Sequence, residues 1–444
     1  MTDDRNPTTR RAALGSMSAV AASAFLAACG SRSSSTATPS TAAASDSTGA
    51  GGASAAPSTA MSAGASTAAG GGGGGGGKTA KIGVIAPFNG PLSAVGLGLQ
   101  YAVALAIKEA NAAGTIKGWT LVLDAQSDDG KVPTAQNAAT GIAADPDIVA
   151  VVGTLNSSTA EVVQPILAKS DIVMISPSNT NPTLTQGAGW VTSKKRPFPN
   201  YFRVCTTDAI QGPFAAQYVF QTLGIKSAAT INDTLTYGKG LTATFQTEFT
   251  KLGGKITKAT TITPGDTNFS STVTQVKATQ PGLVYYGGQY PEAGPLSKQM
   301  GQGGLDIPLM GGDGIFDPLY IKLGGRPKDA CTSVGAPIES LASGKSFIAA
   351  YKAGNYPQPY GSYGGYAFDA ANAIIKALAA TLPSAASAKD ARAAIVKAVQ
   401  GISFAGVGGP VAFDQYGDAT NKTLTVYTDK GGVWGTTKTG SFSG

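Results

Sequence analysis

The feature that most restricts what this chain can fold into is a regular alternation of short apolar runs and helical segments from Lys78 onward. Residues 81–86 form an apolar run that Pro87 ends, and residues 100–112 carry apolar side chains at helical spacing. The alternation continues through apolar runs and helical segments at 120–125, 133–144, 148–152, 159–169 and 173–175. Strands that alternate with helices form parallel sheets with right-handed crossovers. The sequence therefore predicts an α/β fold.

A second α/β unit follows the first without a long linker. It begins after the predicted strand at 201–204, and its predicted strands and helices are residues 212–223, 228–232, 238–252 and 283–286. Two such units predict two Rossmann-like lobes with parallel sheets and a cleft between them. We expect residues 78–206 and 331–403 in lobe I, which includes helices at 367–382 and 388–399, and residues 207–330 and 404–444 in lobe II.

The N-terminal segment indicates export. Thr9, Arg10 and Arg11 precede an uncharged stretch at 12–28, which resembles a twin-arginine signal and is a poor membrane span because it is short and rich in Ala, Ser and Gly. Residues 26–29 match the lipobox of bacterial lipoproteins. That resemblance implies cleavage after residue 28, lipidation of Cys29 and anchoring to the outer face of the cell membrane. Residues 29–77, rich in Gly, Ser and Ala, are predicted to be a disordered tether.

Composition excludes several classes of function. The chain contains no histidine, which removes the commonest general base and the usual zinc ligand. Its 33 basic and 26 acidic residues give a net charge of +7 on a chain that is only 13% charged, so nucleic-acid binding is not expected. We predict no catalytic residues, no metal and no cofactor, and therefore not an enzyme.

Two polar loops follow predicted strands at the edge where ligands bind in open parallel sheets. Residues 153–159 form a hydroxyl-rich turn into a helix, where free backbone N–H groups and the Ser157 hydroxyl suit an anion such as a carboxylate. An ordinary helix cap by Ser157 or Ser158 is the alternative. Residues 176–182 form a second polar turn, which an ordinary turn explains equally well.

Several stretches between residues 78 and 444 together form a specific pattern: KIGVIAPFNGPLSAVG from Lys81, VVGTLNSSTAEVVQPI from Val151, ISPSNTNPTL from Ile175, FRVCTTDAIQGP from Phe202, NDTLTYGKGL from Asn232, TPGDTNFS from Thr263, YYGGQYPEAG from Tyr285 and GGDGIFDP from Gly311. Through these stretches, residues 78–444 resemble the leucine/isoleucine/valine-binding proteins of ABC transporters, which have the type I periplasmic binding fold. The resemblance implies two lobes that close on a small ligand.

The same resemblance assigns roles to individual residues. It implies that Ser157 and Thr180 bind the α-carboxylate of an amino acid, while the Ser178 carbonyl and Asp313 bind its α-ammonium group. The chemistry agrees, because a zwitterion in a dry cleft must exchange its water for paired charges and hydrogen bonds. Asn156 belongs to the same loop as Ser157 and is included in the predicted ligand site.

The side-chain pocket departs from the family. Tyr237 matches an aromatic residue of the family pocket, but Val95 and Gln289 stand where members of the family have tyrosines. These changes enlarge the predicted pocket or make it partly polar. Alternatively, Gln289 points away and Tyr290 replaces the aromatic wall.

The cysteines other than Cys29 suggest a disulfide. The pair found in some family members corresponds to Lys131 and Asn156 here, so both halves are absent. Cys205 and Cys331 both fall at expected crossings between the lobes, and an exported protein permits a disulfide between them. Two buried free thiols are the alternative.

The predicted function is capture of a small amino acid outside the cytoplasm and its delivery to a transporter permease, by a protein that is expected to be a monomer. Closure of the lobes is expected to be a population shift driven by contacts that the ligand makes only in the closed state. The alternatives are a sensory module of the same fold and a binder of a polar amino acid, an amide or a small organic acid.

Overall fold

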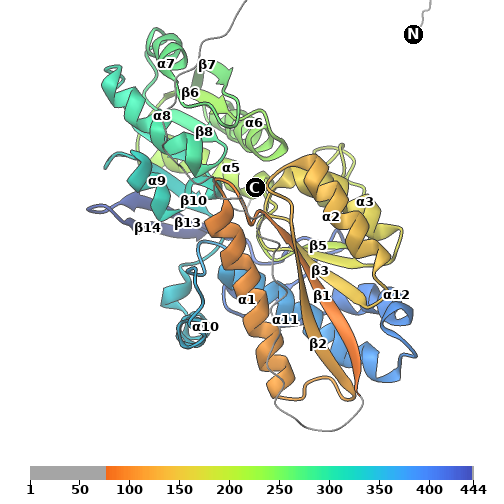
Figure 1. Ribbon diagram of the computed structural model, residues 1–444. Helices are drawn as coiled ribbons and strands as arrows, with labels where there is room; N and C mark the ends of the chain where they lie inside the picture. Colours follow the sequence, from red (N-terminus) through yellow and green to blue (C-terminus); the bar gives the residue numbers. More distant parts are fainter. Residues whose placement is uncertain (1–76, 443–444) are drawn as a thin grey trace, which may run out of the picture. The chain divides into compact units, whose positions relative to one another are not determined.

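The computed structural model describes residues 77–442, which form two large sheets flanked by helices and one two-stranded hairpin (Figure 1). The first sheet has the order β2-β1-β3-β4-β5, and all of its strands are parallel. Its strands are β1 (Lys78–Ala86), β2 (Trp119–Ser127), β3 (Ile148–Gly153), β4 (Val173–Ser176) and β5 (Tyr201–Arg203).

The first sheet is covered by helices on both faces, which is why its strands are almost continuously apolar. Ile82 and Val84 of β1 pack on the side of α1 (Ser93–Ala112) and α11 (Gly364–Thr381), whereas Ile85 packs on the side of α2 (Val132–Ala144) and α3 (Ser157–Ala168). The remaining helices associated with this sheet are α4 (Thr183–Gln186), α10 (Ala342–Ala353) and α12 (Ala388–Gln400). Side chains of successive residues in β1 therefore enter two different cores.

The second sheet has the order β14-β13-β10-β9-β8-β6-β7 and is mixed. Strands β6 to β10 run parallel to one another. At one edge β13 pairs antiparallel with β10, and β14 pairs antiparallel with β13. Its strands are β6 (Ser227–Asn232), β7 (Lys255–Thr261), β8 (Val284–Gly287), β9 (Leu309–Gly311), β10 (Ala330–Ser333), β13 (Thr423–Asp429) and β14 (Trp434–Ser441). Its helices are α5 (Asp208–Gln217), which continues into a π-helical turn at Tyr218–Thr222, α6 (Thr236–Lys251), α7 (Ser270–Lys277), α8 (Tyr290–Gln302) and α9 (Pro318–Leu323).

Two expected lobe boundaries differ from the observed sheets. Cys331 lies in β10, which pairs with β9, so the chain returns to the first lobe only after Ser333. Residues 403–422 lie with the first lobe, because Asp369 of α11 accepts hydrogen bonds from Val407 N and Gly408 N of the hairpin β11 (Ser403–Gly406) and β12 (Gly409–Ala412). The boundaries predicted at 330/331 and 403/404 are therefore wrong. Both crossings between the lobes lie later in the chain, after residue 333 and after residue 422.

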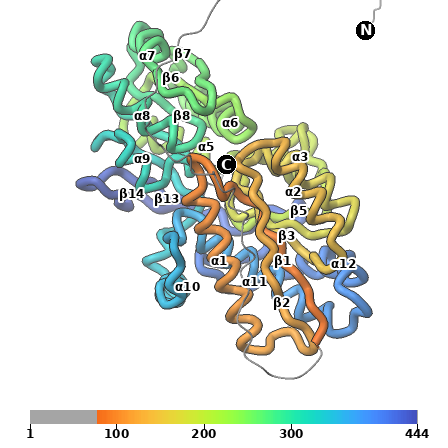
Figure 2. Tube along the Cα trace, in the orientation of Figure 1, coloured from red at the N-terminus to blue at the C-terminus, as the bar shows by residue number. Residues whose placement is uncertain are grey.

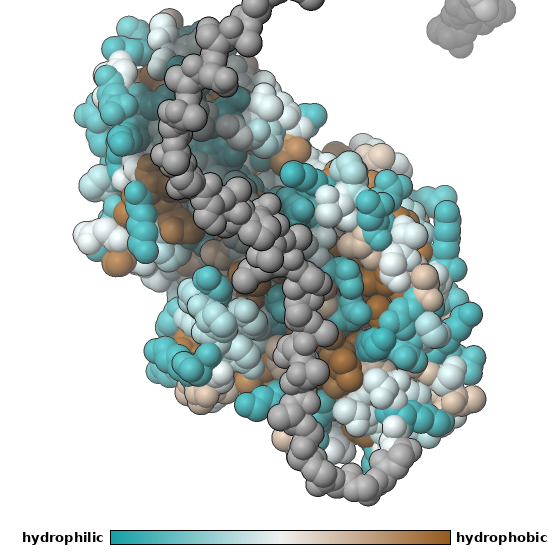
Figure 3. Space-filling view, viewed as in Figure 1, coloured by the Kyte–Doolittle hydropathy of each residue, from teal (hydrophilic) through white to brown (hydrophobic). Residues whose placement is uncertain are grey.

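Distant segments thus build one lobe. Figure 2 shows the blue segment with α11 and α12 beside the orange and yellow strands of the first sheet. A buried ion pair makes the same connection, because Arg203 Nε of β5 lies 2.7 Å from Asp418 Oδ1 near the C-terminal end of the chain. On the face drawn in Figure 3, hydrophilic residues cover much of the visible surface and hydrophobic ones lie in separate patches.

Helix α1 begins at Ser93, seven residues before the predicted start. Its first turns contain two glycines that allow close backbone contacts. A Cβ atom on Gly96 would lie 1.9 Å from Pro87 O, and one on Gly98 would lie 2.8 Å from Tyr360 O. Glycine lowers helix propensity, so the sequence pattern hid a helical start that tertiary packing requires.

The predicted disulfide between Cys205 and Cys331 is wrong. Both residues are buried free cysteines, and Cys205 Sγ instead contacts Asn179 O at 3.4 Å. Cys331 belongs to a strand of the second sheet, whereas Cys205 follows the last strand of the first. Burial raises the pKa of both thiols, which keeps them protonated.

The N-terminal predictions lie outside the described residues. They comprise the signal at 1–28, lipidation of Cys29 and the tether at 29–77, of which only residue 77 is described. Among the helices within residues 77–442, none is both long enough and apolar enough to cross a membrane.

Candidate functional site

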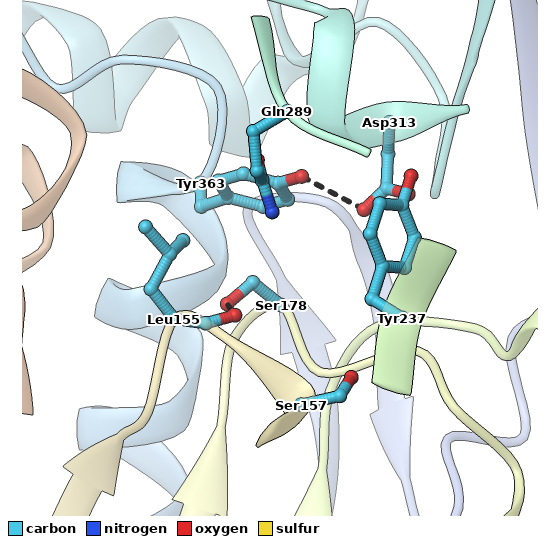
Figure 4. A pocket seen from close by; sticks show the side chains of 7 residues that line it. All are labelled: Leu155, Ser157, Ser178, Tyr237, Gln289, Asp313 and Tyr363. Carbon is cyan, nitrogen blue, oxygen red and sulfur yellow. Dashed lines mark hydrogen bonds between the residues drawn. The ribbon is translucent and has the colours of Figure 1, made fainter. Parts of the chain in front are cut away.

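The loops at the carboxyl ends of the strands surround two small adjoining chambers. Both chambers are lined by Leu155, Gln289, Asp313 and Tyr363, so they form one site with two compartments. Figure 4 shows the first compartment, which is also lined by Ser157, Ser178 and Tyr237. This is the place where ligands bind in open α/β sheets.

Asp313, in the turn after β9, is the charged centre of the site. Its carboxylate accepts hydrogen bonds from Gln211 Nε2 and Tyr237 Oη at Oδ1, both at 2.8 Å, and from Tyr363 Oη at Oδ2, at 2.7 Å. Burial raises the pKa of Asp313, while these three donors act in the opposite direction. Donors directed at both oxygens favour the ionised form of a buried carboxyl group.

The glycines around Asp313 allow Tyr237 to approach the turn closely. A Cβ atom on Gly312 would lie 2.6 Å from Tyr237 Oη, and one on Gly314 would lie 2.9 Å from Tyr237 Cε1. The phenol oxygen accepts a hydrogen bond from Gly314 N at 3.0 Å and donates to Asp313. The GGDG sequence therefore positions both the carboxylate and the ring beside it.

The first lobe contributes hydroxyl groups from two loops. Ser157 is the first residue of α3, is buried, and its Oγ has no hydrogen-bond partner among the described residues. Ser178 Oγ donates to Leu155 O at 3.1 Å, and Asn179 Nδ2 donates to the same carbonyl at 2.9 Å. The loop after β4 is therefore fixed to the loop after β3, and the Ser157 hydroxyl and the N-terminus of α3 face the chamber opposite Asp313 (Figure 4).

Two predicted ligand residues do not line either chamber. Thr180 is fully buried, and its hydroxyl has no partner of ordinary geometry within residues 77–442. Asn156 precedes α3, and its Oδ1 lies 3.8 Å from the place that a Cβ on Gly130 would occupy. The Asn156 side chain thus points toward the loop after β2 rather than into the site, because its position as the helix N-cap turns it outward.

The second compartment contains the residues that depart from the family pattern. Val95 lines it from α1, together with Leu92 and Phe316. Gln289 lines both compartments, whereas Tyr290 lines only the second and donates from Oη to Pro91 O at 2.6 Å. Gln289 and Tyr290, the two candidates for the pocket wall, therefore both line the site. The Gln289 amide lies beside Asp313 and Tyr363 (Figure 4).

Tyr363, Leu155 and Gln211 are among the residues of this site that sequence reasoning missed. Tyr363 lies just before α11, Leu155 lies between two predicted polar residues, and Gln211 contacts Asp313 without lining a chamber. Gln211 falls within the matched stretch FRVCTTDAIQGP, which was the available signal. Nothing in the sequence near Tyr363 indicated that the first lobe would supply a partner for Asp313.

Thr236, the first residue of α6, joins the two lobes. Its N–H donates to Ser158 Oγ at 3.2 Å, its hydroxyl donates to Glu161 Oε2 at 3.0 Å, and its carbonyl accepts from Asn181 Nδ2 at 2.7 Å. The bond from Tyr290 to Pro91 adds a second connection. These contacts close the lobes over the chambers.

Two α/β lobes, linked by chain crossings and closed over a polar chamber, define a type I periplasmic binding fold. Within residues 77–442 there is no group of three or more acidic or cysteine side chains arranged to hold a metal ion. Residues 79–432 match the family model of the periplasmic binding proteins, so the chain belongs to that family. Members of the family are solute-binding proteins of the extracytoplasmic space rather than enzymes.

Individual relatives refine this assignment to the branched-chain amino acid group. The chain is 31% identical over 348 residues to Leu/Ile/Val-binding protein homolog 3 of Brucella melitensis, covering 78% of this chain and 90% of the relative. It is 32% identical over 318 residues to an amino acid binding protein of Pseudomonas aeruginosa, covering 70% and 80% of the two chains. The isoleucine complex of a branched-chain amino acid transporter substrate binding protein from Streptococcus pneumoniae superimposes with a TM-score of 0.71, at 26% identity, covering 82% of this chain and 99% of that one.

Proposed function

We propose that the protein captures a small amino acid, a branched-chain amino acid or a related one, and delivers it to the permease of an ABC transporter. The observation that carries this proposal is the pairing of opposite chemistry across one chamber. Asp313 offers a negative charge from the second lobe, while the Ser157 hydroxyl and the N-terminus of α3 offer hydrogen-bond donors from the first. A zwitterion is the ligand class that complements both sides.

The two compartments can be assigned to the two parts of an amino acid. In this proposal Ser157 binds the carboxylate from the wall of the first compartment, and Thr180, which lines neither compartment here, does so from the loop that also holds Ser178. The Ser178 carbonyl and Asp313 bind the ammonium group. Tyr237 and Leu155 then flank the head group, and the second compartment receives the side chain.

The anchor and the delivery step belong to the same proposal. Lipidation of Cys29 would hold the protein at the outer face of the membrane, where the tether at 29–77 lets it reach a permease. Intact-mass measurement of protein from the producing cell tests this step. We expect a mature chain that begins at a diacylglyceryl-modified Cys29, and an unmodified chain would contradict the anchor.

A second candidate ligand class is favoured by one observation. The Gln289 amide faces both compartments, where an apolar side chain of the ligand would leave it unpaired. A polar amino acid or a small amide would supply that partner. The exchange Gln289→Leu separates the two classes, because it strengthens binding of leucine and weakens binding of an amide-bearing ligand.

The decisive experiment is thermal unfolding of the purified protein, freed of carried-over ligand by unfolding and refolding, with each of the twenty amino acids and a set of small amides and acids. Ligand that binds the native state raises the melting temperature. Shifts with leucine, isoleucine or valine support the first class, and shifts only with polar amino acids support the second. No shift with any amino acid contradicts the proposal.

A further inference from the structure

Two buried carboxyl groups share one amide at the edge of the site. Gln211 Nε2 donates to Asp313 Oδ1 at 2.8 Å and to Asp208 Oδ1 at 3.1 Å. Gln211 Oε1 accepts from Asp313 N at 2.9 Å and from Thr332 Oγ1 at 2.7 Å, so the orientation of the amide is fixed. Asp208 is 0% exposed and Asp313 is 3% exposed. Two negative charges bound to one amide in so buried a setting are strongly unfavourable, so one carboxyl group keeps a proton.

The hydrogen bonds identify Asp208 as the protonated group. Asp313 accepts three side-chain hydrogen bonds, whereas Asp208 accepts one, and Asp208 Oδ2 has no partner among the described residues. Burial, followed by the nearby Asp313, raises the pKa of Asp208 to about 8. Arg203 acts in the opposite direction, but its guanidinium is paired with Asp418.

Thr180 Oγ1 is a suitable acceptor for the proton on Asp208. Asp208 N donates to Thr180 O at 2.8 Å, which brings the loop after β4 against the start of α5. The Thr180 side chain lies close enough to the Asp208 carboxyl group to lower its pKa, and Thr180 Oγ1 is buried without a partner. A hydrogen bond from a protonated Asp208 Oδ2 to Thr180 Oγ1 would satisfy both atoms.

The other groups that face Asp208 do not titrate in the neutral range. The titratable or charged ones are Asp313 after β9, Arg203 at the end of β5, Cys205 after it, Tyr237 of α6 and Tyr285 of β8. Burial raises the pKa of Cys205, Tyr237 and Tyr285, so these three stay neutral, and the three side-chain donors to Asp313 favour its ionised form. A change at this site between pH 6 and pH 9 therefore reports Asp208.

We propose that Asp208 is a positioning residue of the ligand site. It carries a proton at neutral pH and donates a hydrogen bond from Oδ2 to Thr180 Oγ1. Because Thr180 Oγ1 then accepts from Asp208, the hydroxyl proton of Thr180 is free to point at the ligand carboxylate. Ionised Asp208 would instead accept that proton and place a second negative charge near the carboxylate. This inference rests on the proposed function, which assigns Thr180 to the carboxylate of an amino acid.

The test compares Asp208→Asn, which supplies an amide N–H in place of the acid proton and does not titrate, with Asp208→Ala, which supplies no donor. Affinity for L-leucine is measured by calorimetry on the full-length protein between pH 6 and pH 9. We expect wild-type affinity to be constant up to pH 7 and to fall about tenfold by pH 9, one unit above the pKa of a single linked proton. Asp208→Asn should match the wild type within about threefold at pH 6 and lose this fall, whereas Asp208→Ala binds weakly throughout.

A matched control separates this effect from general effects of buried acids. Asp369 of α11 is also buried, and burial raises its pKa to about 7, but it bonds the hairpin β11-β12 of the first lobe and lines neither ligand chamber. Asp369→Asn should keep the wild-type pH profile of binding. Titration of the ligand ammonium group affects all variants equally and cancels in the ratio of affinities.

Two results would overturn the proposal: an Asp208→Asn profile that follows the wild type across the pH range, or Asp208→Asn binding as weakly at pH 6 as Asp208→Ala. If the wild type binds no amino acid, the proposed function fails, and infrared spectroscopy then tests the proton by itself. The difference spectrum between wild type and Asp208→Asn should contain the carbonyl band of a protonated carboxyl group at pH 6 that disappears above pH 8. Absence of this band at pH 6 contradicts the proposal whatever the ligand is.

Discussion

Replacing Asp313 with asparagine should have opposite effects on binding and on stability. In the ligand-free protein an asparagine keeps the surrounding hydrogen bonds, because its Oδ1 still accepts from Gln211 and Tyr237 and its Nδ2 donates to Tyr363 Oη. The substitution therefore removes the negative charge with little change in shape. If the Asp313 carboxylate binds the ammonium group of an amino acid, the substitution removes the negative charge that pairs with this group.

The size of both effects follows from burial. Removing one partner of a buried ion pair costs about 3 to 5 kcal/mol, and the remaining amide dipole favours the lower value, so affinity should fall roughly a hundredfold or more. The ligand-free protein should melt at the same temperature or higher. Burial raises the pKa of Asp313, which means that the folded protein bears a cost for its charge that asparagine removes.

Calorimetry gives the affinity and thermal unfolding without ligand gives the stability, each on wild type, Asp313→Asn and the control Asp233→Asn. Asp233 lies in the same lobe, and burial raises its pKa to about 7, but it lines neither chamber. Its substitution should leave affinity unchanged. Binding by Asp313→Asn within about threefold of the wild type would refute the assignment of the ammonium group, and equal losses in both variants would show that the effect is not specific to the site.

Three further predictions follow from contacts outside Asp313. Thr236→Val removes the hydrogen bond from the Thr236 hydroxyl to Glu161 across the lobes, which is worth about 0.5 to 1.5 kcal/mol. Calorimetry should therefore find the affinity for the amino acid reduced about two- to tenfold. Unchanged affinity would contradict a role of this bond in closure. The stability of the ligand-free protein should fall as pH rises from about 4 to 8. Acids with a raised pKa in the native state, such as Asp208, still hold protons there that the unfolded chain has already released. A melting temperature at pH 8 equal to or above that at pH 5 would contradict these raised pKa values. Gly96→Ala places a methyl group 1.9 Å from Pro87 O, so thermal unfolding should show a loss of about 1 to 3 kcal/mol, and a neutral result would mean that the loop before α1 can move.

Much of the fold was predictable because periodicity is a local property of the sequence. The predicted strands at 148–152 and 228–232 differ from β3 and β6 by single residues at one end. The boundaries between lobes were less accurate, since they depend on which strand pairs with which. Cys331 was expected to begin the segment that returns to the first lobe, but the pairing of β10 with β9 assigns it to the second sheet.

The ligand loops were predictable for a different reason. Parallel strands direct their carboxyl ends to one edge, so polar turns such as those at Ser157 and Ser178 are brought together by topology alone. The direction of a side chain within such a turn is not fixed by topology. Asn156 and Ser157 are neighbours in sequence, yet only Ser157 faces the chamber, because a residue before a helix and the first residue inside it point in different directions.

Tyr363 shows why the completed site exceeds what the sequence indicates. It belongs to the first lobe, and its hydroxyl donates to Asp313 of the second lobe at 2.7 Å, so this hydrogen bond forms only when the lobes are closed. Opening would leave the Asp313 carboxylate with donors from its own lobe, Gln211 and Tyr237. The closed state therefore supplies Asp313 with one additional donor from the protein and, in the proposed function, with the ammonium group of the ligand. A ligand with a positive charge at this position binds the closed arrangement better than the open one, which is the differential contact that a closure driven by population shift requires.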